Sequence, residues 1–146
     1  MKRVIAAAAL SAAFVAVSSF AAEPGPPFSN GPVWDVQQIL TKDGHFDDYI
    51  KWVSTVWKAY QEAWIKAGYT IGYKVYVVVD PRQGEPDIML CTEYKNMAAM
   101  DVSVAEQYAF AAKHFGATAQ QDAKQASRES IRTPVGDVLL REINLK

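Results

Sequence analysis

VWDVQQILTKDGHFDDYIKWVSTVWKAYQEAWIKA, residues 33–67, places a strand directly before a long amphipathic helix. Residues 33–40 are mostly apolar and β-branched, and a short polar segment with one glycine separates them from the helix, as in a turn. From residue 46 to residue 67 apolar side chains recur at alternating spacings of four and three, which predicts a helix with one buried stripe. Gly68 then stands where helices commonly end in a left-handed residue.

The segments after this helix predict the rest of one α+β domain. Residues 73–79 and 88–95 are rich in β-branched and aromatic residues, and the proline- and glycine-containing loop between them predicts a hairpin. A second helical region is expected over 97–130, with a break at Gly116, and a last strand over 135–145. The order strand, helix, strand, strand, helix, strand predicts a ferredoxin-like βαββαβ fold with a four-stranded antiparallel sheet.

The segment before the first strand has the features of an export signal. Lys2 and Arg3 precede an apolar run of about fourteen residues, which is shorter than a membrane-spanning helix requires. We predict a signal peptide over 1–21, a proline-rich flexible leader over 22–32 and one domain over 33–146. The expected location is periplasmic or secreted, with no stable membrane insertion once the signal is cleaved.

Composition narrows the function classes. Without the signal peptide the chain has 13 basic and 16 acidic residues, and this balance argues against nucleic-acid binding, which needs clustered positive charge. Cys91 is the single cysteine, so no intramolecular disulfide is possible. His45 and His114 are far apart in the sequence, which is a weak basis for a metal or haem site, and we predict neither metal nor cofactor.

The chain resembles the dimeric α/β-barrel superfamily in the order of its elements and in the patterns of several segments. These segments are VWDVQQIL, TKDGHF before DDYIKW, the pair YKVYVVV and DIMLCTEY, and the closing GDVLLREI. The resemblance covers residues 33–145 and implies a homodimer whose two sheets face each other. Members include cofactor-free monooxygenases and haem-binding enzymes. The haem-degrading branch uses an asparagine on the first strand with a tryptophan and a histidine on the second helix. Here Asp35 and His114 occupy those elements and the tryptophan is missing, so this catalytic set is not transferred.

Alternation along the strands predicts a mixed polar and apolar face on the sheet. If the more apolar side of each strand packs on the helices, with Trp34 among its members, the other side carries the candidate ligand-binding residues Asp35, Gln37, Tyr76, Glu93 and Arg141. Three interpretations of this face remain open: polar pairing across a dimer interface, a small-ligand cavity, or a general base at Asp35 or Glu93. Trp52 lies at the edge of the helix stripe and is a candidate interface residue.

The function expected from the sequence is an exported, homodimeric domain that binds a small apolar or amphipathic ligand or a partner. Two alternatives remain. One is a cofactor-independent monooxygenase or related small-molecule enzyme, and the other is a structural accessory protein.

Overall fold

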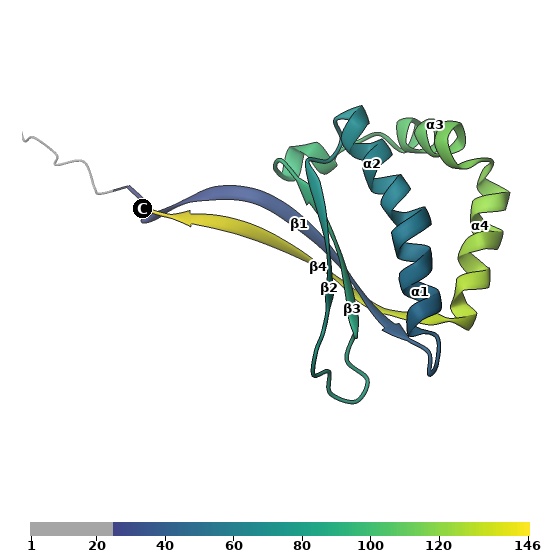
Figure 1. Ribbon diagram of the computed structural model, residues 1–146. Coiled ribbons are helices and arrows are strands. Elements are labelled where there is room, and N and C mark those ends of the chain that lie inside the picture. Colours follow the sequence, from purple (N-terminus) through teal and green to yellow (C-terminus); the bar gives the residue numbers. More distant parts are fainter. Residues whose placement is uncertain (1–24) are drawn as a thin grey trace, which may run out of the picture.

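The computed structural model describes residues 25–146, which form one antiparallel sheet with helices on one side (Figure 1). The strands are β1 (Phe28–Thr41), β2 (Gly72–Val77), β3 (Ile88–Tyr94) and β4 (Arg132–Leu145), in the order β2-β3-β1-β4. Every neighbouring pair is antiparallel. The α+β class and the four-stranded antiparallel sheet are therefore confirmed, and the arrangement is compatible with a ferredoxin-like fold. The predicted signal peptide lies outside the described residues.

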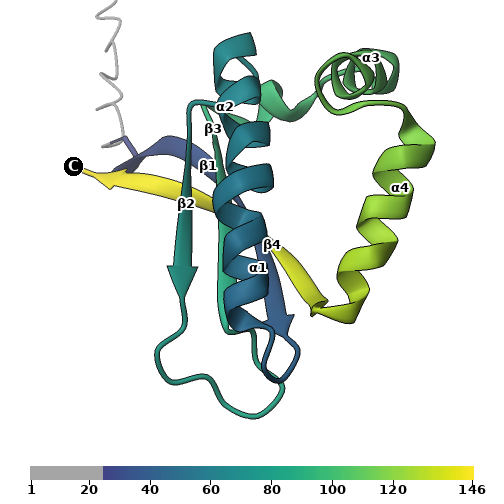
Figure 2. The same cartoon turned by 45° about the vertical axis from the view of Figure 1, so that its right-hand side comes forward.

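One continuous helix follows β1, as the apolar spacing predicted. It consists of α1 (Phe46–Trp52), the single π-helical turn η1 (Val53–Trp57) and α2 (Lys58–Ala67). Gly68 closes it with φ of 81°, a left-handed conformation that glycine adopts without a steric penalty. The helix crosses the sheet over β2, β3 and part of β1 (Figure 2).

The second helical region is divided more finely than expected. It consists of the short 3₁₀ turn η2 (Met97–Met100), the helices α3 (Val104–Phe115) and α4 (Thr118–Ser127), and the 3₁₀ turn η3 (Arg128–Ser130). The predicted break at Gly116 is confirmed. Aromatic rings attach α3 to the end of α2, with ring centroids 4.4 Å apart for Trp64 and Phe110.

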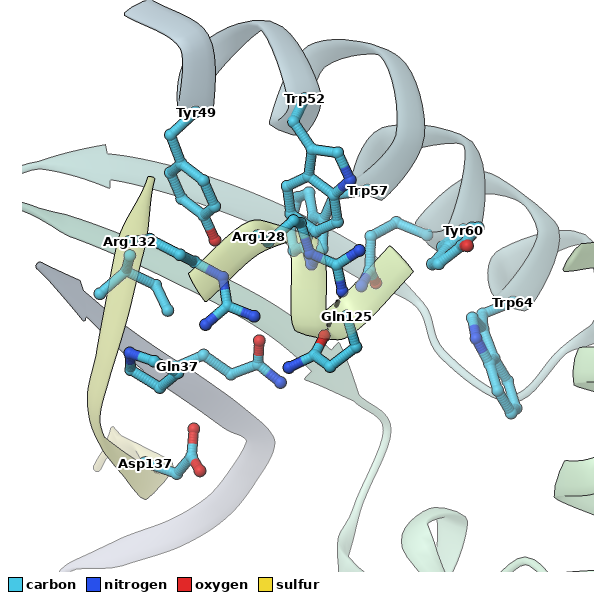
Figure 3. A pocket seen from close by; sticks show the side chains of 13 residues that line it. Gln37, Tyr49, Trp52, Trp57, Tyr60, Trp64, Gln125, Arg128, Arg132 and Asp137 are labelled. Atoms are coloured by element: carbon cyan, nitrogen blue, oxygen red, sulfur yellow. Dashed lines mark hydrogen bonds between the residues drawn. The ribbon is translucent and has the colours of Figure 1, made fainter. Parts of the chain in front are cut away.

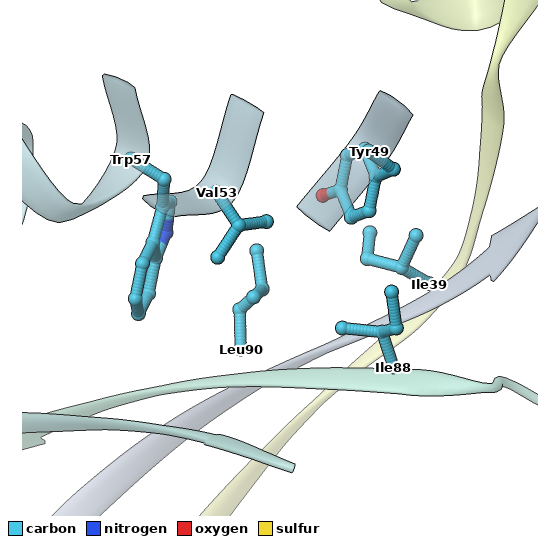
Figure 4. Close-up of a cluster of buried hydrophobic side chains, with 6 residues drawn as sticks. All are labelled: Ile39, Tyr49, Val53, Trp57, Ile88 and Leu90. Carbon is cyan, nitrogen blue, oxygen red and sulfur yellow. The ribbon is translucent and has the colours of Figure 1, made fainter. Parts of the chain in front are cut away.

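The hydrophobic core lies between the α1–α2 helix and the sheet (Figure 4). Ile88 and Leu90 of β3 and Tyr49 of α1 are at most 1% exposed. The other members of the cluster are Ile39, Val53 and Trp57. Burying these large side chains is the main favourable contribution to folding that the contacts reveal.

Strand β1 begins at Phe28, so residues 28–32, assigned above to a flexible leader, are part of the sheet. They pair with the end of β4, where Phe28 faces Leu145. The register shifts between Asn30 and Val33, and at Gly31 a Cβ atom would come within 3.1 Å of Glu142. Glycine permits this close approach. Pro32 is tolerated beside the bulge because β3 pairs with β1 only from Val33 onward, which leaves the other edge of β1 free at this point.

Strand β4 also begins earlier than predicted, at Arg132, and passes through Pro134. A proline is acceptable there because β4 is an edge strand and its register against β1 shifts between Gln38 and Ile39. The free edge of β4 is long, and most of its side chains are exposed.

Helix α4 stands apart from the α1–α2 helix and has no buried residue (Figure 2). Its sequence TAQQDAKQAS contains no apolar side chain larger than alanine, so it lacks the stripe that draws a helix onto a sheet. Strand β4 is consequently exposed from Pro134 onward, and Gln37 of the neighbouring β1 is exposed as well.

Candidate functional site

The predicted face of the sheet is reversed on β1 and β4, whereas Tyr76 and Glu93 of β2 and β3 lie on the face away from the helices, as expected. Sequence reasoning placed Trp34 against the helices and Asp35 and Gln37 on the opposite face. Ile39, which shares a face with Asp35 and Gln37, instead belongs to the core beneath the helix. Asp35 and Gln37 therefore point to the helix side, in the half of the sheet that α4 leaves uncovered.

The five candidate ligand-binding residues are divided between the two faces. Arg141 pairs in register with Val33, so it shares the helix side with Asp35 and Gln37. Tyr76 and Glu93 lie on the opposite face, because Glu93 pairs with Trp34 and Tyr76 pairs with Met89. No single site can include all five residues.

The reversal has a physical cause in the apolar character of both faces. Val36 and Cys91 are 5% and 4% exposed although they lie on the face away from the helices. Their neighbours cover them: Lys74 places its ammonium 4.8 Å from the Trp34 ring, and the Trp34 indole donates a 3.5 Å hydrogen bond to Glu142. Counting apolar residues therefore does not identify the helix side of this sheet.

A cavity lies on the helix side, over the β1–β4 half of the sheet (Figure 3). Its volume is about 390 Å³, within the range of small-ligand sites. Of the five candidates only Gln37 lines it. The full lining is Gln37, Ile39, Tyr49, Trp52, Trp57, Tyr60, Gln61, Trp64, Gln125, Arg128, Arg132, Pro134 and Asp137.

The π-helical turn η1 brings two indoles to this cavity. Trp52 and Trp57 are five residues apart and would point about 140° away from each other in a regular α-helix. A π turn accommodates one extra residue, and both side chains line the cavity. The Ser54 and Thr55 hydroxyls donate hydrogen bonds of 2.9 and 2.7 Å to the Lys51 carbonyl, one turn earlier.

Two arginines, Arg128 of η3 and Arg132 at the start of β4, face the same cavity. Arg132 is 5% exposed, its guanidinium is 6.0 Å from the Tyr49 ring centroid, and its Nε and Nη1 atoms have no hydrogen-bond partner. The Arg128 guanidinium lies 4.3 Å from the Trp52 ring centroid. Figure 3 shows both guanidinium groups directed into the space between the helix and the strands.

Two pKa values in the cavity are shifted because its groups are shielded from water and because two positive charges, those of Arg128 and Arg132, lie close together. Burial, and secondarily the positive charge of Arg132, lowers the pKa of the Arg128 guanidinium. Burial raises the pKa of Tyr49 to about 12, although both arginines act in the opposite direction. Tyr49 is therefore a neutral hydroxyl at physiological pH and not a phenolate.

Acidic groups lie on the strand side of the cavity. Asp137 lines it, and Asp35 is half-buried nearby on β1. Burial, with a smaller contribution from the Asp137 charge, raises the pKa of the Asp35 carboxyl. In the described residues neither Asp35 nor Arg141 belongs to an ion pair, so the expected neighbours do not form one.

Sequence reasoning missed Arg128 and Arg132. They lie four residues apart in SRESIRTP, a segment that was assigned to a helix end. The available signal was that Arg132 is followed at once by a strand-forming segment, which brings this arginine next to the sheet. Trp52 was identified as an edge residue, and it packs on the core beneath Arg128.

A smaller hollow lies on the opposite face, between Trp34, Lys74 and Leu140, with Cys91 at its base. Burial raises the pKa of the Cys91 thiol, and the charge of Lys74 lowers it less. This thiol is therefore poorly suited to act as a nucleophile.

The described residues contain neither a helix long and apolar enough to cross a membrane nor a cluster of side chains arranged to hold a metal ion. Comparison of the chain with protein-family models, curated proteins and solved structures finds no match.

Proposed function

We propose that this protein is an exported, homodimeric binding protein that holds a small apolar or amphipathic ligand in the cavity between the α1–α2 helix and the β1–β4 half of the sheet. The observation that carries the proposal is the lining itself. Aromatic rings form one wall, and a few polar side chains converge from the strands and from η3. Concave sites with this mixture are typical of small-ligand binding.

The binding proposal can be tested with a neutral fluorescent probe, N-phenyl-1-naphthylamine, whose emission rises in an apolar site. Gln37→Trp places a bulky ring in the cavity and should reduce probe binding at least tenfold. Gln38→Trp is the matched control, because residue 38 is next in β1 and points to the opposite face. Equal binding by both variants, or no binding by the unaltered protein, would contradict the proposal.

The homodimer is supported by the sheet face that the helices leave uncovered. Tyr76, Val138 and Leu140 lie on this face and are 50%, 38% and 51% exposed. An apolar sheet face at this exposure is typical of a protein interface, and a two-fold dimer buries the same patch on both copies. The resemblance to dimeric α/β-barrels points to the same face.

Light scattering at micromolar concentrations tests the dimer, and the expected mass is that of two chains. Leu140→Lys should reduce it to one chain, because two lysines would be buried at the symmetric interface. Leu139→Lys is the control, since residue 139 is equally exposed on the other face of β4. A mass of one chain for the unaltered protein would refute the dimer.

Export rests on the first 21 residues alone. Expression of the full chain in a bacterium, followed by sequencing of the mature N-terminus, should give a chain that begins at Ala22 and is recovered from the periplasm or medium. An intact N-terminus on protein recovered from the cytosol would contradict this part of the proposal.

A further inference from the structure

The Arg132 side chain is buried without the partners that a buried guanidinium normally has. Only 5% of the residue is exposed, and two of its nitrogen atoms, Nε and Nη1, are buried and form no hydrogen bond. Its contact with the Tyr49 ring, at 6.0 Å, leaves these N–H groups unsatisfied. Buried charges are usually paired, because an unsatisfied one costs folding free energy.

No acidic side chain of the described residues forms an ion pair with Arg132. The ion pairs of the described chain involve His45, Lys58 and Arg82, and none includes Arg128 or Arg132. Asp87, the acid on the neighbouring loop, instead accepts hydrogen bonds from the backbone N–H and the hydroxyl of Thr41. The positive end of the cavity is therefore open to an anion.

The Arg128 side chain, at the same end of the cavity, is held in a fixed position by its neighbours. Its Nη1 donates a 3.0 Å hydrogen bond to the Lys124 carbonyl, and its Nη2 donates to the Gln125 side chain. The guanidinium is stacked on Trp52, and Trp52 is stacked on Tyr49 with ring centroids 5.4 Å apart. Its Nε, like the two Arg132 atoms, has no partner. A guanidinium fixed in this way loses little side-chain entropy when an anion binds.

We infer that the ligand of this cavity is an organic anion, a flat apolar molecule with one carboxylate whose oxygens accept hydrogen bonds from Arg132 and Arg128. The inference rests on the proposed binding function and specifies its ligand class. The planar fork of a guanidinium matches a carboxylate, and the aromatic side chains beside it suit a flat apolar body. Asp137, on the strand side of the cavity, disfavours a second acidic group at the far end of the ligand.

Two probes with the same naphthalene ring separate the contribution of the charged group to affinity from that of the ring. 1-Naphthoate carries a carboxylate, and 1-naphthamide carries a neutral amide. Binding to the purified protein is measured by quenching of tryptophan fluorescence, since Trp52 and Trp57 line the cavity. We expect 1-naphthoate to bind on the order of tenfold to a hundredfold more tightly, the range of a charge-assisted hydrogen bond. Equal affinity for the two probes overturns the inference but leaves the proposed function standing. If neither probe binds and N-phenyl-1-naphthylamine does not bind either, the proposed function fails and the inference fails with it.

Arg132→Met keeps the length of the side chain and removes its charge. It should remove the preference for 1-naphthoate while changing the affinity for 1-naphthamide less than threefold. Arg82→Met is the control, because Arg82 lies in the β2–β3 loop, away from the cavity, and its side chain is 88% exposed. A preference for 1-naphthoate that survives Arg132→Met overturns the inference.

Unfolding without any probe distinguishes a ligand-binding arginine from a structural one. If Arg132 serves a ligand, the ligand-free Arg132→Met protein should melt at the same or a higher temperature, because an unpartnered buried charge has been removed. Added 1-naphthoate should raise the melting temperature of the unaltered protein and leave that of the variant unchanged. A large drop in the melting temperature of the ligand-free variant would show that Arg132 is structural and would overturn the inference.

Discussion

The two halves of the sheet differ in what covers their helix side. Over β3 the α1–α2 helix packs closely, and Ile88 and Leu90 are at most 1% exposed, whereas Val75 and Val77 of the edge strand β2 are 38% and 50% exposed. No helix lies against β4, and Leu139 is 53% exposed although it points to the same side. In β1, Ile39 still belongs to the core, whereas Gln37 is exposed. We call the β2–β3 half the closed half and the β1–β4 half the open half.

The difference shows that polar residues on the helix side occur where the helix layer is absent. Asp35, Gln37 and Asp137 all belong to the open half, and the cavity lies above it. Most of the buried core lies in the closed half, and most polar groups of the candidate site lie in the open half. Substitutions that act on one half only can test this division.

The largest difference is expected between two leucine truncations. Leu90→Ala removes a fully buried side chain from the closed half and should lower the free energy of unfolding by about 2–5 kcal/mol. Leu139→Ala, in the open half, should change it by less than about 0.5 kcal/mol. Urea denaturation of the two variants measures both values, and similar losses would show that the open half is as well packed as the closed half.

Tyr49, at the boundary of the two halves, provides a pH-dependent test. Its pKa is about 12 in the folded protein, against 10.0 for an ordinary tyrosine. Between these values the folded state keeps a proton that the unfolded state has lost, so stability falls as pH rises from 10 to 12, by up to about 2–3 kcal/mol. Chemical denaturation across this pH range should show the fall, and Tyr49→Phe should reduce its slope. An unchanged slope in that variant would assign the effect to other groups.

The sequence predicts the closed half better than the open half. Spacings of four and three identify the helix, and dense β-branched residues identify β2 and β3, because each pattern reflects burial against one neighbour. Which half of the sheet the helices leave bare depends on how α4 packs, and α4 has no apolar stripe from which to predict its position. Asp35 and Gln37 were assigned to the wrong face for another reason, because both faces of the sheet carry buried apolar residues.

The cavity wall was unpredictable for a second reason. A spacing of five residues, as between Trp52 and Trp57, has no place in the α-helical pattern, and only the π turn at η1 brings both side chains to one cavity. Arg132 was missed because its burial depends on contacts with Tyr49 from a distant part of the sequence.

The π turn itself can be weakened from outside the cavity. The combined variant Ser54→Ala and Thr55→Ala removes both hydroxyl hydrogen bonds to the Lys51 carbonyl. We expect a loss of about 1 kcal/mol in the free energy of unfolding, because both groups are exposed and water replaces part of each bond. Probe binding should weaken as Trp52 and Trp57 lose their alignment. A change in stability with fully retained binding would show that these hydroxyls do not maintain the wall.

The smallest effect is expected within the open half, between its two aspartates. Asp35 has a raised pKa chiefly because it is desolvated and secondarily because Asp137 is negative. Asp137→Asn should therefore lower the pKa of Asp35 without restoring its ordinary value, which a carboxyl-carbon NMR titration can follow. A carboxyl whose pKa is raised on folding disfavours the folded state above that pKa, so the variant should gain a few tenths of a kcal/mol at neutral pH. If water were excluded from the open half as it is from the closed half, the repulsion between Asp35 and Asp137 would be much stronger. A gain of several kcal/mol would mean that a covering layer, such as a second subunit or a ligand, excludes water there.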